Sequence, residues 1–236
     1  MYLSRLILNP RNRAVQRDLA DCQQLHRTVM GAFPQAAGSA ARAEMGVLYR
    51  LDSDRNRGTL ALLVQSGVEP NWSSLPAGYV REGTAGISCK KVDEHYGQLR
   101  AGMVLAFRLR ANPTRKIDTR SGPLGERRNG RRVELRGDEA QINWLLRKGQ
   151  QYGFRVLAVR ASAGNQLGLS GAGRLLGQRA VNGAAGQKVR VTLESVLFEG
   201  RLMITDDGKF HQALEMGIGP GKAYGLGLLS VAPPGR

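Results

Sequence analysis

The sequence predicts an α+β fold that is built from two consecutive β-α-β-β-α-β units. Its 236 residues suffice for two domains of about 100 residues each. The order strand, helix, strands, short helical segment, strand occurs twice along the chain, and Gly97–Gly102 is a plausible junction between the two runs. We therefore predict an N-terminal domain over residues 1–96 and a C-terminal domain over residues 103–236.

The first run of elements follows from residue spacing and turn residues. Partial apolar alternation over Tyr2–Leu8, closed by an Asn-Pro dipeptide, predicts a strand. Asp18–Phe33 carries one apolar stripe at helical spacing and is therefore predicted to be a helix. Val47–Leu51 and Thr59–Gln65 are expected to form a strand pair, and Tyr79–Val80 is expected to begin an edge strand.

The second run repeats this order. Alternation over Met103–Arg110 predicts a strand with one apolar face, and Asp138–Lys148 is predicted to be a helix that Asp138 caps and Gly149 ends. The remaining predictions are strands over Phe154–Val159 and Val189–Phe198, with Leu202–Ile204 as a continuation, a loose hairpin within 163–187, a helix over Asp206–Met216 and a last strand over Gly225–Val231.

The net charge of +16 indicates a polyanionic partner. The chain has 35 Lys and Arg against 19 Asp and Glu, and such an excess repels itself unless an anion is bound. Nucleic acid is the first expectation, an anionic membrane surface the second and a merely soluble basic surface the third. Most of the basic residues are Arg, whose planar guanidinium suits phosphates and bases, which favours nucleic acid. No apolar run approaches the roughly 18 residues that a membrane span needs.

Basic residues concentrate in two parts of the chain. Leu105–Arg136 holds ten basic and three acidic residues, and Gly153–Leu193 holds six basic residues and no acidic one. Pro123 and neighbouring glycines predict a loop over Arg115–Arg132, which argues against a basic membrane helix. The residues of this loop that we expect to contact nucleic acid are Arg115, Lys116, Arg127, Arg128, Arg131 and Arg132.

A glycine-rich segment near the C-terminus, Gly217–Gly227, is the most distinctive stretch. It lacks the Ser or Thr of a Walker A loop and the third glycine of a dinucleotide fingerprint, and it follows a predicted helix. Backbone N–H groups that approach closely, together with one ammonium group, suit a phosphate backbone. The residues assigned to this contact are Gly217, Gly219, Gly221, Lys222 and Gly225. The alternative is a tight helix-to-strand connection that needs glycine for positive φ.

Few residues are available for acid–base or metal chemistry. The chain has three histidines, His26, His95 and His211, and no motif of a zinc protease, a serine hydrolase or a Cys-x-x-Cys site. We therefore expect no metal and no cofactor. Cys22 and Cys89 cannot form a disulfide framework, and the N-terminus lacks a secretory signal pattern, so we expect a cytoplasmic protein.

His26 is the leading catalytic candidate. It lies beside the apolar stripe of the first predicted helix, so it is either a half-buried structural histidine or a general acid or base. RNA carries its own nucleophile in the 2′-hydroxyl, so a ribonuclease without a metal needs only proton transfer and stabilisation of the phosphorane charge. His95 is expected to be solvated, and His211 is a weaker candidate.

Five segments stand in a distinctive order along the chain: Met1–Pro10, Arg17–Thr28, Phe107–Pro113, Val196–Leu202 and Gly217–Pro233. Together they resemble the CasE family, the CRISPR-repeat endoribonucleases of the type I-E Cascade complex. The resemblance implies two tandem ferredoxin-like (RRM-like) domains that bind the stem-loop of a CRISPR repeat. It also implies metal-independent cleavage that leaves a cyclic phosphate, with other Cascade subunits as partners and no membrane.

The resemblance also assigns roles to residues. The histidine of the family's first helix, its proposed acid/base group, corresponds to His26. Family members often carry a tyrosine three residues earlier, where this chain has Gln23, and a basic residue further along, where it has Met30-Gly31. Stabilisation of charge is therefore expected from Arg27 or Lys222. The basic hairpin that the family lays into the groove of the RNA stem corresponds to Arg174, Arg179, Lys188 and Arg190.

Two alternatives to an endoribonuclease stay open. The altered position Gln23 makes a non-catalytic RNA-binding subunit of a CRISPR ribonucleoprotein plausible. A general RNA-binding protein without a CRISPR role is the third interpretation. Cleavage of repeat RNA that depends on His26 would distinguish the endoribonuclease from both.

Overall fold

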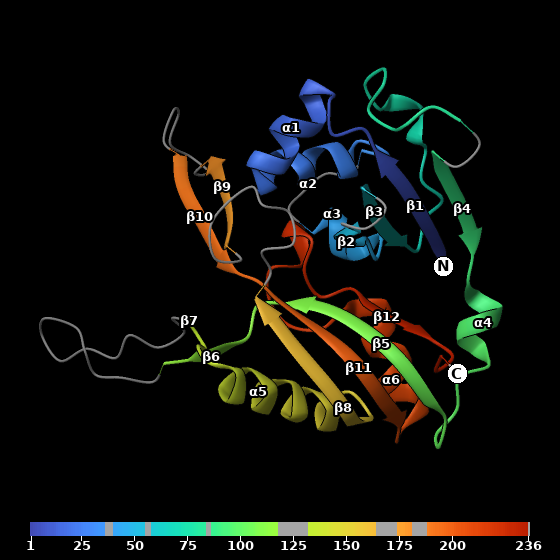
Figure 1. Ribbon diagram of the computed structural model, residues 1–236. Coiled ribbons are helices and arrows are strands. Elements are labelled where there is room, and N and C mark those ends of the chain that lie inside the picture. The colour runs from blue at the N-terminus through green and yellow to red at the C-terminus, as the bar shows by residue number, and fades with distance from the viewer. Residues whose placement is uncertain are drawn as a thin grey trace, which may run out of the picture.

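The computed structural model describes residues 1–35, 40–54, 58–83, 86–117, 132–163, 174–180 and 188–235. Figure 1 shows two bodies of strands and helices, the N-terminal one above the C-terminal one, and a β-hairpin that projects from the lower body beside the helices of the upper one. Both ends of the chain lie on the same side of the molecule (Figure 1).

The N-terminal domain is a four-stranded antiparallel sheet with its main helices between the first and second strands. Its elements are β1 (Tyr2–Leu8), α1 (Arg13–Ala20), α2 (Cys22–Met30), α3 (Ala41–Glu44), β2 (Leu48–Asp54), β3 (Thr59–Ser66), the 3₁₀ turn η1 (Trp72–Ser74), β4 (Ile87–Lys91) and α4 (Asp93–Gly97). The strand order is β2-β3-β1-β4. The second helix of the β-α-β-β-α-β unit is reduced to the single turn η1.

The C-terminal domain has the same topology with two full helices. Its elements are β5 (Val104–Ala111), β6 (Thr114–Lys116), β7 (Arg132–Glu134), α5 (Asp138–Gln151), β8 (Phe154–Ala163), β9 (Arg174–Ala180), β10 (Lys188–Glu194), β11 (Val196–Ile204), α6 (Asp207–Met216), the 3₁₀ turn η3 (Lys222–Tyr224) and β12 (Leu229–Ala232). The sheet order β12-β5-β11-β8 matches that of the first domain. The predicted fold class is confirmed.

Each sheet has its own apolar core against its helices. The N-terminal core includes Leu6, Leu8, Val29, Tyr49 and Leu62. The C-terminal core includes Phe107, Leu145, Phe198, Phe210 and Leu229. Tyr96, from the first predicted domain, packs against the C-terminal core, and the bounds 1–96 and 103–236 stay a prediction.

The prediction of one helix over Asp18–Phe33 is wrong, because α1 and α2 take its place. Asp21 between them has an extended backbone (φ −135°, ψ 109°) and ends the first helix. Its carboxylate accepts a hydrogen bond from the backbone N–H of Gln23 and so caps α2. Because α2 starts afresh at this cap, His26 lies in the middle of a separate short helix.

Gly149 does not end α5, which continues to Gln151. A Cβ atom at Gly149 would lie 2.5 Å from the carbonyl oxygen of Phe154, so glycine permits the close approach of β8 rather than terminating the helix. Asp138 is the first helical residue, and Gly137 occupies the position before it.

Several predicted strands also differ. The strand predicted over Val189–Phe198 divides at Ser195 into β10, which pairs with β9, and β11 of the C-terminal sheet. Tyr79–Val80 forms only a single bridge to β1, and the edge strand is β4 instead. The ends of the loop predicted over Arg115–Arg132 pair as the short hairpin β6–β7, and β12 starts only at Leu229.

Buried polar side chains join the two domains. Arg50 of β2 donates from Nη1 to the carbonyl oxygen of Leu228 at 3.2 Å and to the hydroxyl of Ser230 at 3.0 Å. Gln65 of β3 donates from Nε2 to the carbonyl oxygen of Leu214 at 2.6 Å. These contacts fix α6 and the beginning of β12 relative to the N-terminal domain.

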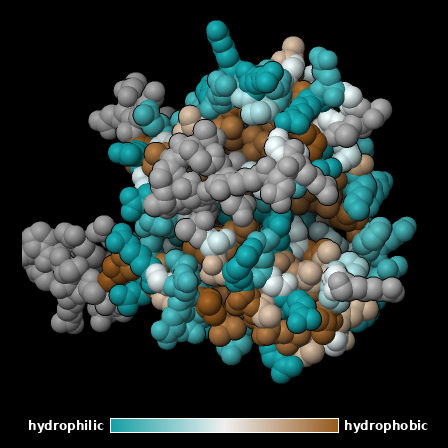
Figure 2. Space-filling model, in the orientation of Figure 1, coloured by the Kyte–Doolittle hydropathy of each residue, from teal (hydrophilic) through white to brown (hydrophobic). Residues whose placement is uncertain are grey.

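The visible surface mixes hydrophilic and hydrophobic residues, with several hydrophobic ones over the C-terminal domain (Figure 2). Within the described ranges, no helix combines the length and the apolar character that crossing a membrane requires.

Candidate active site

His26 lies where the two domains meet. Its half-buried imidazole faces η3, the turn within the glycine-rich segment. The rings of His26 and Tyr224 meet edge to face, with their centroids 6.4 Å apart and an interplanar angle of 65°. Among the described residues, the buried Nδ1 of His26 has no hydrogen-bond partner. This histidine is therefore not a polar group that the fold satisfies internally.

Two basic side chains of the N-terminal domain act on His26, and Lys222 of the C-terminal domain lies in the same cluster. Burial lowers the pKa of His26 below 6.5, and the positive charges of Arg42 on α3 and Arg27 on α2 lower this pKa further. Burial also lowers the pKa of Lys222, and Arg42 again adds to the effect. No carboxylate of the described residues is among the groups that shift these two pKa values. The cluster is therefore electrostatically suited to an anion.

The turn that carries Lys222 and Tyr224 is held on the N-terminal domain. The hydroxyl of Tyr49, on β2, donates to the carbonyl oxygen of Ala223 at 2.6 Å. A Cβ atom at Gly225 would lie 3.0 Å from the ring of Tyr49. The loop therefore needs a glycine at this position to pack so closely.

The glycines of this segment adopt left-handed backbone conformations. The φ angles are 73° at Gly217, 85° at Gly219, 82° at Gly221 and 79° at Gly225. This conformation and the close packing account for the glycines as a tight connection, which is the alternative that the sequence leaves open. Contact of these four glycines with phosphate stays a prediction.

A path of basic groups leads from η3 to the short hairpin β6–β7. Burial is the largest cause of the lowered pKa of Lys222, and the charge of Lys148 on α5 adds to it. Burial is also the largest cause of the lowered pKa of Lys148, and the charge of Arg132 on β7 adds to it. Arg115 lies opposite Val133, and Lys116 opposite Arg132, on the paired strands. The predicted residues Arg127, Arg128 and Arg131 lie outside the described residues.

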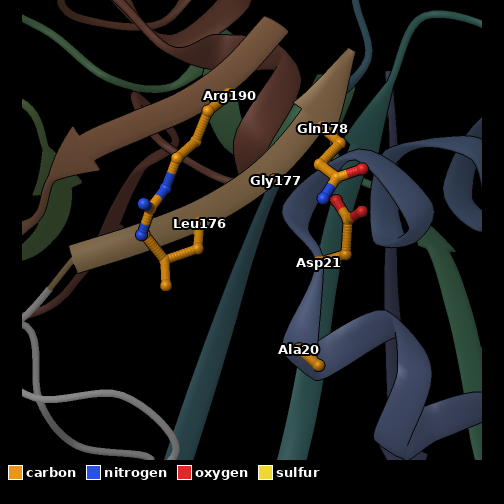
Figure 3. A pocket seen from close by; sticks show the side chains of 6 residues that line it. All are labelled: Ala20, Asp21, Leu176, Gly177, Gln178 and Arg190. Atoms are coloured by element: carbon orange, nitrogen blue, oxygen red, sulfur yellow. The ribbon is translucent and has the colours of Figure 1, made fainter. Parts of the chain in front are cut away.

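The hairpin β9–β10 contacts the beginning of α2. A Cβ atom at Gly177 would lie 2.8 Å from the carboxylate of Asp21 and 2.8 Å from Sγ of Cys22. The pocket at this contact is lined by Ala20, Asp21, Leu176, Gly177, Gln178 and Arg190. In Figure 3 the side chains of Gln178 and Asp21 point toward one another across it. The hairpin and α2, the helix that carries His26, are thus adjacent.

The predicted basic residues of this hairpin occupy both strands. Arg174 of β9 forms an ion pair with the carboxylate of Glu194 at 3.0 Å, and Arg190 of β10 is exposed. Arg179 is paired with Val189, and Lys188 with Ala180, in the register of the two strands. The contact of these residues with RNA stays a prediction.

The other residues considered for catalysis or its support differ in their exposure and in the element that carries them. Gln23 is half-buried in the first turn of α2, three residues before His26, and Arg27 is exposed on the same helix. His95 is exposed, as predicted. His211 of α6 lies at the other domain junction, with its Nε2 2.8 Å from the carbonyl oxygen of Tyr96.

Sequence reasoning missed three residues of the site. Arg42 is an isolated basic residue and Lys148 directly follows Arg147, both in ordinary helical surroundings, and no sequence signal singles them out. Tyr224 lies inside the glycine-rich segment, and its place there could have marked it as a candidate site residue.

The whole chain is similar to CRISPR-associated proteins. Residues 1–233 match a family model described as CRISPR associated protein. The chain is 36% identical over 233 residues to the CRISPR-associated endoribonuclease Cse3 of Thermus thermophilus, with 99% of this chain and 100% of the relative covered. It is 31% identical over 235 residues to the CRISPR system Cascade subunit CasE of Escherichia coli, with the same coverage.

A solved structure gives the same result. The endoribonuclease Cse3 bound to a 19-nucleotide RNA matches with a TM-score of 0.71 at 33% identity, covering 98% of this chain and 99% of that one. Sequence and fold therefore agree over nearly the full length, and the chain belongs to the Cse3/CasE family of CRISPR-associated endoribonucleases.

Proposed function

We propose that the chain is a metal-independent endoribonuclease that cleaves CRISPR precursor RNA at the repeat stem-loop and stays bound to its product as a Cascade subunit. The observation that carries this proposal is the half-buried His26 within a cluster of cations at the domain junction. The names of the relatives, an endoribonuclease and a Cascade subunit, support the same activity and partners.

His26 is suited to remove the proton of the attacking 2′-hydroxyl. Because burial and the charges of Arg42 and Arg27 lower its pKa, the neutral imidazole is favoured, and this form can accept a proton. The 2′-oxygen then attacks the adjacent phosphorus, and the bond from phosphorus to the 5′-oxygen breaks. The upstream product ends in a 2′,3′-cyclic phosphate.

Lys222 and Arg42 are suited to hold the scissile phosphate. Attack adds negative charge to the phosphorane oxygens, and fixed cations in a partly dehydrated site stabilise that charge. Both side chains are half-buried, and their positive charges repel one another in the free protein. A bound phosphate relieves this repulsion. Exposed Arg27 and half-buried Gln23 are assigned supporting contacts on the same side of the cluster.

The rest of the RNA follows the basic groups of the C-terminal domain. The stem runs along β6–β7 and past Lys148 to the site, while β9–β10 enters its groove. The glycine-rich segment adds backbone N–H contacts to phosphates. We assign the protein to the cytoplasm, a setting that suits the two free thiols of Cys22 and Cys89.

Incubation of the purified protein with its cognate repeat RNA in EDTA tests the proposal. We expect the wild type to cut at one position below the stem. His26→Ala should bind the RNA equally well and cut it about 10²–10⁴-fold more slowly, the usual contribution of one proton-transfer group. His95→Ala is the matched control, because His95 is exposed and far along the chain from α2.

The same experiment decides between an endoribonuclease and a non-catalytic RNA-binding subunit. Binding of the repeat RNA without cleavage by the wild type would favour the non-catalytic RNA-binding subunit, for which Gln23 in place of the family's tyrosine is the specific argument. Cleavage that persists in His26→Ala would remove His26 from the mechanism.

A further inference from the structure

Cleavage of RNA moves two protons, and His26 accounts for only one of them. The 2′-hydroxyl must lose a proton, and the departing 5′-oxygen must gain one. Gln23, three residues before His26 on α2, carries an amide, which forms hydrogen bonds but does not act as an acid at neutral pH. A second proton-transfer group must therefore come from another element.

Tyr224 brings a phenol to His26 from the other domain. The edge-to-face contact of the two rings, at 6.4 Å between centroids, spans the junction between α2 and η3. Tyr224 is half-buried, as His26 is, and the turn that carries it also carries Lys222 of the basic cluster. A phenol has an ordinary pKa of about 10 and keeps its proton at pH 7, as a general acid must.

The position of Tyr224 is fixed without RNA. The residue before it, Ala223, accepts the hydrogen bond from the buried hydroxyl of Tyr49 at 2.6 Å. Gly221 and Gly225 flank the turn with left-handed φ angles of 82° and 79°. A site whose groups are held before the substrate binds gains most from their orientation.

We propose that Tyr224 is the general acid of the cleavage reaction and that it acts opposite His26 as the base; this inference rests on the proposed function. His26 takes the proton of the 2′-hydroxyl, the 2′-oxygen bonds to phosphorus, the bond from phosphorus to the 5′-oxygen breaks, and the phenol gives its proton to the 5′-oxygen. An imidazolium and a phenolate remain. Proton transfer from the first to the second, directly or through water, restores both groups.

A repeat RNA with sulfur in place of the bridging 5′-oxygen at the cleavage site tests this role. A thiolate departs without being protonated, so loss of the general acid slows cleavage of ordinary RNA only. Tyr224→Phe keeps the ring contact and removes the hydroxyl. We expect its single-turnover cleavage of ordinary RNA to fall about 10²-fold, with cleavage of the 5′-thio RNA within about 2-fold of the wild type.

The controls separate the possible roles. Tyr2→Phe, on β1 where the ring contacts Lys91, should cut both RNAs like the wild type. His26→Ala should cut both slowly, because the 2′-hydroxyl still has to lose its proton. An equal loss on both RNAs in Tyr224→Phe, or no loss on either, would overturn the proposal. If Lys222→Gln, and not Tyr224→Phe, cuts ordinary RNA slowly and the 5′-thio RNA like the wild type, the general acid is Lys222.

The proposed function fails separately from this inference. If the wild type cleaves neither RNA, the chain is not an endoribonuclease, whatever the role of Tyr224. If the wild type cleaves the ordinary RNA and Tyr224→Phe cleaves it equally fast, only the role of Tyr224 is lost.

Discussion

Two junctions between the domains each bring a histidine and a tyrosine together, and they differ in how the imidazole is satisfied. At one, His26 meets the ring of Tyr224, and its Nδ1 lacks a hydrogen-bond partner among the described residues. At the other, Nε2 of His211 lies 2.8 Å from the carbonyl oxygen of Tyr96, whose hydroxyl donates to Gln65 at 3.0 Å. The second junction is a completed hydrogen-bond network, and the first is not.

The charges around the two histidines differ in the same sense. The pocket beside His211 is lined by carboxylates as well as by the N-terminus, and Asp93 forms an ion pair with the ammonium of Met1. The groups that act on His26 are Arg42 and Arg27. Burial alone therefore does not separate the proposed catalytic histidine from the one with a structural hydrogen bond. The two histidines are separated by an unsatisfied hydrogen-bonding atom that lies among positive charges, because an anionic substrate can supply the missing partner.

Replacing each histidine by alanine should separate activity from stability. His211→Ala loses a hydrogen bond at the junction, worth about 1 kcal/mol, and its Tm should fall by about 2–4 °C while the folded protein cleaves RNA at the wild-type rate. His26→Ala should lose cleavage and keep its Tm, because it removes a buried polar group with no partner for Nδ1. Scanning calorimetry and single-turnover cleavage measure the two effects. A cleavage defect in His211→Ala as large as that in His26→Ala would contradict the distinction.

Removing the charge of Arg42 should change the pH dependence of cleavage. Arg42 lowers the pKa of His26, so Arg42→Gln raises that pKa toward 6.5. A histidine acts as a general base only in its neutral form. As the pH is lowered, the cleavage rate of the variant therefore begins to fall at a higher pH than the cleavage rate of the wild type. The rate at the plateau should drop by about 10-fold, because a charge-assisted contact to the phosphorane is lost.

A pH–rate profile of Arg42→Gln beside Arg5→Gln measures this effect. Arg5 is exposed on β1 and provides a change of charge outside the cluster. If the acidic limb of Arg42→Gln coincides with that of the wild type, Arg42 does not act on the catalytic base, and the difference between the two junctions no longer rests on charge.

The sequence predicts those parts of the fold that local residues determine. Tyr2–Leu8 is the predicted strand with the predicted bounds, because its apolar alternation and its Asn-Pro end are local. The break at Asp21 was not predictable from the apolar stripe, since that stripe begins only at Cys22 and carries no information about the residue before it. All five residues of β4 are exposed, so this edge strand has no apolar alternation to reveal it.

The same limit applies to the site. His26 could be predicted as a candidate because the segment around it carries both an apolar stripe at helical spacing and the family resemblance. Its partners Tyr224 and Arg42 reach it only through folding, and the hydrogen bond that holds the turn of Tyr224 joins residues as far apart as Tyr49 and Ala223. A pattern within one window cannot contain such a contact. Gly149 shows the reverse, because a residue that locally signals a helix end instead serves the approach of β8.

Removing one tyrosine hydroxyl at each junction should sharpen the comparison with the smallest effects. Tyr49→Phe and Tyr96→Phe each lose one hydrogen bond between buried or half-buried groups, so each should lose about 1 kcal/mol of stability, or about 2–4 °C in Tm. Only Tyr49→Phe loosens the turn of Tyr224, and we expect it alone to slow single-turnover cleavage, by about 3-fold for a modest misplacement.

The two variants control for one another because they make the same chemical change, one at each junction between the domains. A difference in cleavage rate between them therefore measures the positioning of η3 and not a general loss of stability. Equal rates would mean that the packing of Gly225 against the ring of Tyr49, which phenylalanine preserves, is sufficient to hold the turn. In that case the fixed geometry beside His26 derives from the absence of a side chain at Gly225, and the hydroxyl of Tyr49 serves stability alone.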